Sequence, residues 1–195
     1  MSDQPTPPAA APAETAADRR LPGDLSPQDE LHRMLRVDLA GEYGAARIYA
    51  GQLAVLGRSP SGPTLRHMAA QEQRHLDQIT QMAADRRVRP TALQPLWHVA
   101  GFALGAASAL LGEKAAMACT VAVEEVIDEH YRRQADRLGD REPAVRASIE
   151  EFRRDELEHR DTALQHGAAE APAQALLSGL VKAGSRAAIW LSERF

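Results

Sequence analysis

Six residues of this chain have the side-chain types and the spacing of ligands for a pair of metal ions. The sequence carries two Glu-x-x-His motifs, one in each half, and a further glutamate 30 or 32 residues before each motif. Carboxylate and imidazole ligands in this number leave open positions on two ions such as iron, which suits oxygen chemistry. Facing helices of a four-helix bundle can supply such a set to a dinuclear centre. The six residues are Glu42, Glu72, His75, Glu124, Glu156 and His159.

The two motifs taken alone are weak evidence for metal, because chance gives about 0.5 such pairs in a chain with this content of Glu and His. The four glutamates are more informative. Each interrupts a stripe of apolar residues spaced three and four apart, the pattern of a core-facing helix side. Buried carboxylates are costly and repel one another unless metal ions bind them. We therefore predict that the six residues form one buried metal site.

The apolar stripes also indicate which of two neighbouring glutamates faces the core. Glu124 continues the apolar stripe of its segment, whereas Glu125 shares a polar face with other charged residues. Glu156 and Glu158 differ in the same way. Because a ligand must point into the core of the bundle, the sequence predicts Glu124 and Glu156 as ligands and the other two as solvated.

Three further residues near these stripes leave alternatives open. Tyr131 continues the stripe of Glu124, either as a core residue with a hydrogen-bonded hydroxyl or as a group that relays protons or electrons. Asp128 on the same stripe, and Asp38 one turn before Glu42, could orient a ligand histidine. Either aspartate could equally be a carboxylate at the solvated rim of the site.

Helices must position these residues, and the sequence has the periodicity for them. Apolar stripes with Pro or Gly near their ends predict helices over 26–57, 64–84, 112–139, 143–167 and 172–195. No segment alternates with period two for long enough to be a strand, so we expect an all-α fold. Residues 1–25 are rich in Pro and Ala, which predicts a disordered tail followed by one domain over 26–195.

Composition narrows the partners. The net charge of −4, without any basic run, argues against a nucleic-acid partner. The single cysteine, Cys119, excludes an internal disulfide and a cysteine-based zinc site, and it fits a reducing cytosol. The first 20 residues lack the apolar core of a signal peptide. We therefore expect a cytosolic chain that does not bind nucleic acid.

A long uncharged stretch separates the two halves. Residues 90–112 contain no Asp, Glu, Lys or Arg over 23 positions. A single membrane crossing there would put the two halves of the metal site on opposite sides, so we expect an element that lies at a membrane surface. The C-terminal segment 173–195 is also apolar and carries Trp190. For both segments, a buried helix or an oligomer interface is the alternative.

These features together resemble the di-iron demethoxyubiquinone hydroxylase family of ubiquinone biosynthesis. The resemblance covers residues 28–195. The Glu/His pattern alone would also fit ferritins, whereas the motif PLW-x-x-x-GFALGA and the final Leu-Ser-Glu-Arg would not. It implies a ferritin-like four-helix bundle with a di-iron centre and additional apolar, membrane-docking helices. The segments that carry it are RVDLAGEYGA (36–45), QEQRHL (71–76), RVRPTALQPLWHVAGFALGAASALLGEKAAMACTVAVEEVIDEHY (87–131), FRRDELEHRD (152–161) and the terminal AGSRAAIWLSERF.

The resemblance implies an enzyme that places one atom of O2 on the ring of a polyprenyl demethoxyubiquinol and releases the other as water. His130 and Tyr131 are implied to deliver electrons or protons. NADH is the implied reductant, although the sequence has no GxGxxG fingerprint of a stable dinucleotide site. The implied iron ligands are Glu42, Glu72 and His75 for one ion and Glu124, Glu156 and His159 for the other, with Glu72 and Glu156 bridging.

The resemblance further implies a peripheral protein on the cytoplasmic face of the cell inner membrane. A homo-oligomer, or assembly with other ubiquinone-biosynthesis proteins, is open. Two other ferritin-like functions are alternatives, namely iron storage and peroxide scavenging. The second is weakened because the sequence has no CxxC pair for the rubredoxin module that such scavengers usually carry.

Overall fold

The structure is a computed structural model that describes residues 23–195, and all its secondary structure over that range is helical. The prediction of an all-α fold is therefore confirmed. Residues 1–22, most of the predicted tail, lie outside the described residues. The helices are α1 (Pro27–Leu56), α2 (Gly62–Asp85), α3 (Gln94–Leu110), α4 (Glu113–Leu138), α5 (Pro143–Gln165), the 3-10 helix η2 (Ala168–Glu170) and α6 (Gln174–Ser192).

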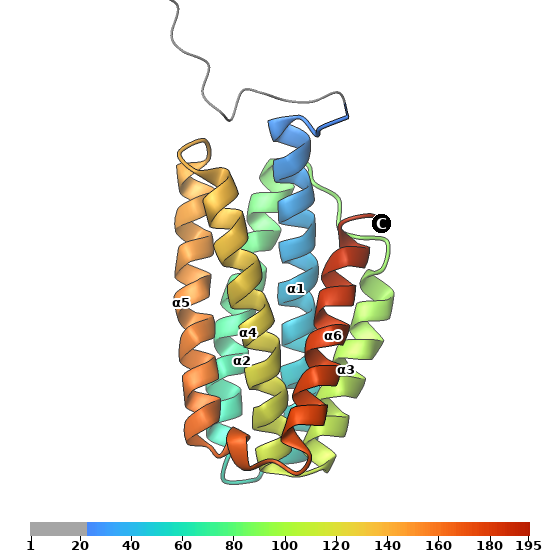
Figure 1. The fold of residues 1–195 in the computed structure, drawn as a ribbon, viewed down its shortest axis with the longest axis vertical. Coiled ribbons are helices and arrows are strands. Elements are labelled where there is room, and N and C mark those ends of the chain that lie inside the picture. Colours follow the sequence, from blue (N-terminus) through green and yellow to red (C-terminus); the bar gives the residue numbers. More distant parts are fainter. Residues whose placement is uncertain (1–22) are drawn as a thin grey trace, which may run out of the picture.

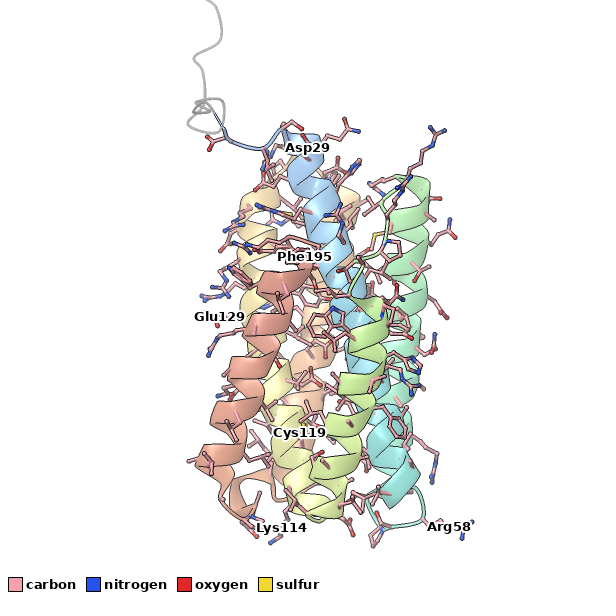
Figure 2. All side chains as sticks on the ribbon, turned by 90° about the vertical axis from the view of Figure 1, so that its right-hand side faces the viewer. Asp29, Arg58, Lys114, Cys119, Glu129 and Phe195 are labelled. Atoms are coloured by element: carbon pink, nitrogen blue, oxygen red, sulfur yellow. The ribbon has the colours of Figure 1, made fainter. Side chains whose placement is uncertain are left out.

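The six α-helices run side by side in three layers of two (Figure 1). Helices α1 and α4 form the middle layer, with α2 and α5 packed on one side and α3 and α6 on the other. Figure 2, turned by 90°, shows α3 and α6 in front of the other four. The four helices predicted to hold the metal site are thus the two layers α1/α4 and α2/α5, and the two apolar segments form a third layer.

Helix α1 begins where the sequence predicts. The Ser26 hydroxyl accepts a hydrogen bond from the Asp29 backbone N–H at 3.0 Å, and Pro27 occupies the first helical position. Asp29 and Glu30 place negative charge in the first turn, where the helix dipole favours it. This start fixes the rotation of the longest helix, and therefore which of its residues face the core.

Two apolar clusters flank a polar layer in the bundle. Leu35, Ile79 and Ile149 belong to the cluster on one side of this layer along the bundle axis. Leu65 and Met117 belong to the cluster on the other side. All five side chains are fully buried, so both clusters exclude water from the layer between them.

Helix α3 lies against α1 with unusually little space between the backbones. A Cβ atom added at Gly105 would lie 1.9 Å from the Ile48 carbonyl oxygen, and one at Gly51 would lie 2.2 Å from the Phe102 carbonyl oxygen. Only glycine allows such an approach. The small residues of the uncharged stretch therefore serve close packing on α1.

Two features differ from the sequence-based expectation. The last helix begins at Gln174 rather than at 172, because the short η2 and Ala173, with a φ of 50°, turn the chain first. The stretch 90–112 forms α3 only from Gln94 to Leu110. Across residues 23–195, no helix combines the length and the apolar character that a membrane crossing needs.

Candidate metal centre

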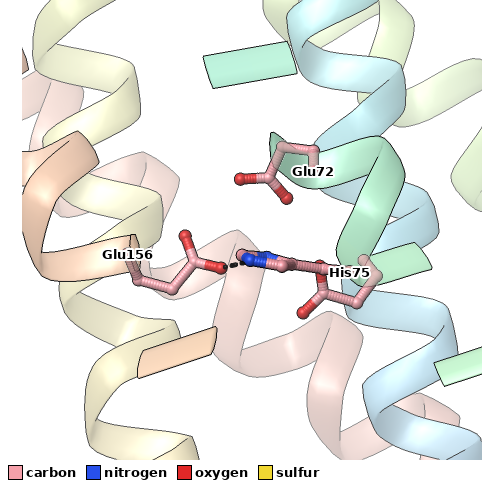
Figure 3. A group of neighbouring side chains, drawn as sticks. Glu72, His75 and Glu156 are labelled. Carbon is pink, nitrogen blue, oxygen red and sulfur yellow. Dashed lines mark ion pairs between the residues drawn. The ribbon is translucent and has the colours of Figure 1, made fainter. Parts of the chain in front are cut away.

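The six predicted ligands lie together in the polar layer of the bundle. Helices α1 and α4 each contribute one glutamate, and α2 and α5 each contribute a Glu-x-x-His pair whose spacing puts both side chains on one helix face. None of the six predicted ligands is more than 2% exposed. Figure 3 shows Glu72 and His75 of α2 pointing toward Glu156 of α5. Glu125 and Glu158, predicted to be solvated, are exposed.

The six residues form two overlapping groups. Within each group, one ligand atom per residue lies within 4.8 Å of the others. Glu72 and Glu156 belong to both groups, as carboxylates that bridge two ions would. The remaining members are Glu42 and His75 in one group and Glu124 and His159 in the other. Each group could hold one metal ion, and the ligand assignment itself stays a prediction.

Both histidines turn the same ring nitrogen toward the carboxylates. Nδ1 of His75 lies 3.3 Å from Glu156 Oε1, and Nδ1 of His159 lies 3.1 Å from Glu72 Oε1. Their Nε2 atoms point outward, 3.0 Å from Asp155 Oδ2 and 3.2 Å from Gln71 Oε1 respectively. An outer acceptor of this kind fixes the ring and leaves Nδ1 for metal.

Sequence reasoning missed Asp155 and Gln71. A signal was present, because each immediately precedes the glutamate of a Glu-x-x-His motif. Each residue nevertheless contacts the histidine of the other helix, Asp155 of α5 with His75 of α2 and Gln71 of α2 with His159 of α5. Only the relative placement of α2 and α5 reveals the pairing.

Several buried polar atoms at the centre lack a hydrogen-bond partner among the described residues. Both carboxylate oxygens of Glu72 and of Glu156 are in this state, with one oxygen each of Glu42 and Glu124. Buried oxygens of this kind are costly unless something binds them. Cations at the two groups would bind them, so the donor set fits a pair of metal ions.

The same crowding shifts the ionisation of the cluster. Burial and the charge of Glu156 raise the pKa of Glu72 from 4.5 to about 8. Burial alone would lower the pKa of His75, but the nearby carboxylates of Glu156 and Glu42 raise it to about 11, and those of Glu156 and Glu72 raise the pKa of His159 to about 9. Without metal, the centre therefore holds protons that binding metal ions would displace.

Two tyrosines bind the glutamates of the middle layer reciprocally. The Tyr131 hydroxyl of α4 donates to Glu42 of α1, and the Tyr49 hydroxyl of α1 donates to Glu124 of α4 at 3.0 Å. Each tyrosine lies seven residues, or two turns, after the glutamate of its own helix. Tyr131 is buried and hydrogen-bonded, as its core alternative predicts, and it also touches a predicted ligand. The role of Tyr49 was not evident from its place in an apolar stripe.

His130, beside Tyr131, belongs to a separate polar network. Its Nε2 lies 3.2 Å from Asp38 Oδ1 and 2.9 Å from the Gln134 amide nitrogen. Asp38 is therefore buried and holds a histidine, but not one of the predicted ligands. Asp128 bonds Arg153 at 2.5 Å instead of a histidine, so the second alternative for it, a carboxylate at the rim, is the one observed.

Similarity to known proteins identifies the family of the chain. A family model described as ubiquinone biosynthesis protein COQ7 matches residues 29–192. The chain belongs to the COQ7 family. It is 63% identical over 179 residues to the 3-demethoxyubiquinol 3-hydroxylase of Rhodospirillum rubrum, covering 91% of this chain and 84% of that protein. The resemblance seen in the sequence is thus confirmed.

More distant relatives agree. The chain is 54% identical over 166 residues to the mitochondrial NADPH-dependent 3-demethoxyubiquinone 3-hydroxylase of Homo sapiens, covering 83% of this chain and 76% of that protein. It is 42% identical over 181 residues to the mitochondrial 5-demethoxyubiquinone hydroxylase of Saccharomyces cerevisiae, covering 84% and 78%. These relatives carry the names of hydroxylases, and not of iron-storage or peroxide-scavenging proteins.

In this COQ7-family chain, an apolar groove of about 370 Å³ lies beside the centre, between α3 and α6. Gly41, Gly44 and Ala45 of α1 form part of its floor and flank Glu42 in the sequence. At one end, the Trp97 indole N–H donates to the Ser192 hydroxyl at 3.1 Å, which joins α3 to α6. The groove is a site for an apolar molecule, which would lie against the segment of α1 that carries Glu42.

A second cavity of about 320 Å³ opens next to His130. Its lining has four arginines against two glutamates, Glu30 and Glu193, and this excess of cations suits an anionic ligand. His130 and Gln134 connect this cavity to the buried Asp38. The cationic and aromatic lining residues are Arg33, Arg133, Arg137, Arg186 and Trp190.

Proposed function

We propose that this protein is a di-iron 3-demethoxyubiquinol 3-hydroxylase, which uses O2 to hydroxylate the ring of a polyprenyl demethoxyubiquinol. The observation that carries the proposal is the pair of overlapping Glu/His groups beside an apolar groove. The names of the relatives support the reaction. Residues 26–195 form the catalytic domain, a ferritin-like bundle to which α3 and α6 are added.

In this proposal, the chain's own side chains hold two iron ions in the polar layer. When bound, the irons supply the electrons and the open positions with which O2 reacts, one oxygen atom entering the ring and the other leaving as water. The two flanking apolar clusters exclude bulk water from this layer. The ligands are Glu42, Glu72 and His75 for one ion and Glu124, Glu156 and His159 for the other, with Glu72 and Glu156 shared.

The groove between α3 and α6 binds the quinol. Its small floor residues, Gly41, Gly44 and Ala45, leave room for an aromatic ring against the segment of α1 that carries Glu42. Ile48 and Leu104 line the groove further along α1 and α3, where a prenyl tail would extend. Apolar walls bind such a tail by removing it from water.

NADH is the reductant in this proposal, and the arginine-lined cavity is where it docks. Arginine binds phosphate oxygens in a bidentate way, and four arginines line this cavity. His130 lies at this cavity, and the neighbouring Tyr131 donates to Glu42. These two residues therefore form the route for protons and electrons from the cavity to the centre.

The α3/α6 layer docks on the membrane that holds the substrate, at the cytoplasmic face of the cell inner membrane. Large apolar side chains on these helices are exposed, which is unusual without a partner surface. Apolar residues of this kind, with a tryptophan near the end, favour an interfacial position. The exposed residues are Leu96, Val99, Leu110, Leu176, Leu180 and Trp190.

The proposal is tested by deleting the gene in its host and measuring the masses of the extracted isoprenoid quinones. We expect a quinone that lacks one methoxy group to accumulate. The wild-type gene should restore the normal mass, whereas Glu156→Ala should not. A matched variant, Glu158→Ala, removes a solvated carboxylate from the same helix and should restore it. A normal quinone profile in the deletion strain would contradict the proposal.

A further inference from the structure

The two halves of the proposed centre repeat one arrangement. Each half has a glutamate in the middle layer, a reciprocal tyrosine bond to that glutamate, and a histidine that presents Nδ1 to the carboxylates. The burial of the two histidines is also matched, with 2% of His75 and 1% of His159 exposed. In these respects, neither half would bind metal better than the other.

The repeat is broken at the outer nitrogens of the histidines. His75 Nε2 lies 3.0 Å from the carboxylate of Asp155, whereas His159 Nε2 lies 3.2 Å from the amide oxygen of Gln71. Both acceptors occupy the same place, one residue before a Glu-x-x-His motif. Their shapes are alike and their charges differ, because one is an anion and the other is neutral.

We propose that Asp155 is a positioning residue that makes the His75 position the tighter of the two metal positions, so that it fills first. A carboxylate that accepts from the outer N–H of an imidazole makes the metal-facing nitrogen a stronger donor. An amide acceptor orients the ring equally but polarises it less. The inference deepens the proposed function, since it rests on the two metal positions assumed there.

Solvent limits the size of the effect. The Asp155 side chain is 28% exposed, so water weakens its influence on the imidazole. Loss of such outer partners typically lowers metal affinity about 10- to 100-fold, and we expect the lower end, about tenfold. The aromatic contacts of the two histidines also differ, because Phe152 stacks on His75 with ring centroids 4.4 Å apart, whereas Tyr49 meets His159 edge-on at 6.0 Å. Neither ring carries a charge, and both are left in place by the test.

The experiment titrates the metal-free, full-length protein with Co²⁺ and follows binding by calorimetry and visible absorption. We expect two steps in the wild type, the first about tenfold tighter than the second. Asp155→Asn keeps an acceptor oxygen for the histidine but removes its charge. We expect it to weaken the first step about tenfold and to bring the two steps together.

The matched control is Glu158→Gln, which removes one carboxylate from the same helix at an exposed position away from both histidines. It should leave both steps unchanged. His159→Ala should retain the tight step and His75→Ala the weak one, with helical content checked by circular dichroism. If either histidine variant fails to fold, the comparison of Asp155→Asn with Glu158→Gln still decides.

Unchanged affinities in Asp155→Asn, or two equal steps in the wild type, would overturn the inference while leaving the proposed function intact. Failure of the proposed function alone can also be recognised, because two unequal binding steps in a protein that does not hydroxylate quinol would refute only that function. A wild-type protein that binds no Co²⁺ would refute both.

Discussion

At the scale of single residues, the six predicted ligands could be found from sequence because each carboxylate interrupts an apolar stripe. That argument distinguishes Glu124 from Glu125, since helix periodicity alone decides which one faces inward. It could not find Asp155, Gln71 or Tyr49 as partners of the site. Their contacts cross between helices, and they depend on how two helices are placed relative to each other.

The protonation of the metal-free centre predicts an unusual dependence of stability on pH. The pKa of Glu72 rises from 4.5 to about 8 on folding, and those of His75 and His159 rise to about 11 and 9. A raised pKa means that the folded state binds more protons, so each contribution is full below the unfolded pKa and is lost as pH rises through the folded one. The pKa of Glu156 is lowered to about 2, so the stability that this residue contributes is lost only as the pH falls from 4.5 toward that value.

We therefore expect the free energy of unfolding of the metal-free protein to fall between pH 5.5 and pH 8.5. Metal ions should reverse this trend, because they replace the bound protons and bind more tightly at high pH. Urea unfolding at both pH values, once with a chelator and once with Co²⁺, measures the free energy of unfolding in each state. Stability of the chelated protein that rises with pH would show that the centre is not protonated in this way.

The reciprocal tyrosines offer a matched pair of variants. Tyr131→Phe removes the donor to Glu42 next to His130, and Tyr49→Phe removes the equivalent donor to Glu124 in the apolar interior. If Tyr131 is on the delivery route, its loss should lower kcat about 100-fold, as removal of a proton-transfer group does. Tyr49→Phe should cost about tenfold or less. Steady-state rates at equal iron content compare them, and equal losses would remove Tyr131 from the route.

At the scale of elements, most helices could be predicted, because apolar periodicity and terminal Ser, Pro and Gly mark them. The start of α6 could not, since η2 and the left-handed Ala173 depend on packing against α4. The sequence also did not reveal that the glycines of α3 let it lie against α1. Contacts between backbones leave no periodic signal in one chain.

Close packing of α3 on α1 predicts the effect of one methyl group. Gly105→Ala would place a Cβ 1.9 Å from the Ile48 carbonyl oxygen, so α3 must move away. We expect the protein to lose about 2 kcal/mol of stability, as in other overpacked sites. Gly179→Ala on α6 meets nothing within 4 Å and should be neutral or stabilising. Urea unfolding of both variants tests this, and equal stabilities would refute the tight contact.

At the scale of the whole molecule, the three layers of helices separate the predicted metal centre from the exposed apolar face of α3 and α6. The middle layer shares the metal centre with α2 and α5 on one side, and it forms the floor of the groove under α3 and α6 on the other. In the proposed function, the apolar tail of the substrate lies in this groove, on the α3/α6 side of the middle layer. The order of the layers was not predictable from sequence, although the apolar character of both outer segments was.

This layering predicts which face meets the membrane. Leu180→Glu on α6 places a charge in the proposed docking face, whereas Leu164→Glu places one on α5 in the opposite layer. The first should weaken vesicle binding about tenfold or more, because it replaces an exposed leucine proposed to enter the membrane with a charged residue, and the second should not. Flotation with vesicles of bacterial phospholipid measures both. Equal binding of the two variants would assign the exposed residues to another partner.

The central claim is that this bundle places one atom of O2 on the ring of a demethoxyubiquinol. The most direct measurement uses the purified protein loaded with iron, a demethoxyubiquinol substrate, NADH and ¹⁸O2, with mass spectrometry of the quinone product. We expect a product that carries one ¹⁸O atom in its new hydroxyl group, formed by the wild type and not by Glu156→Ala. A product whose new oxygen comes from water, or the same yield from Glu156→Ala, would contradict it.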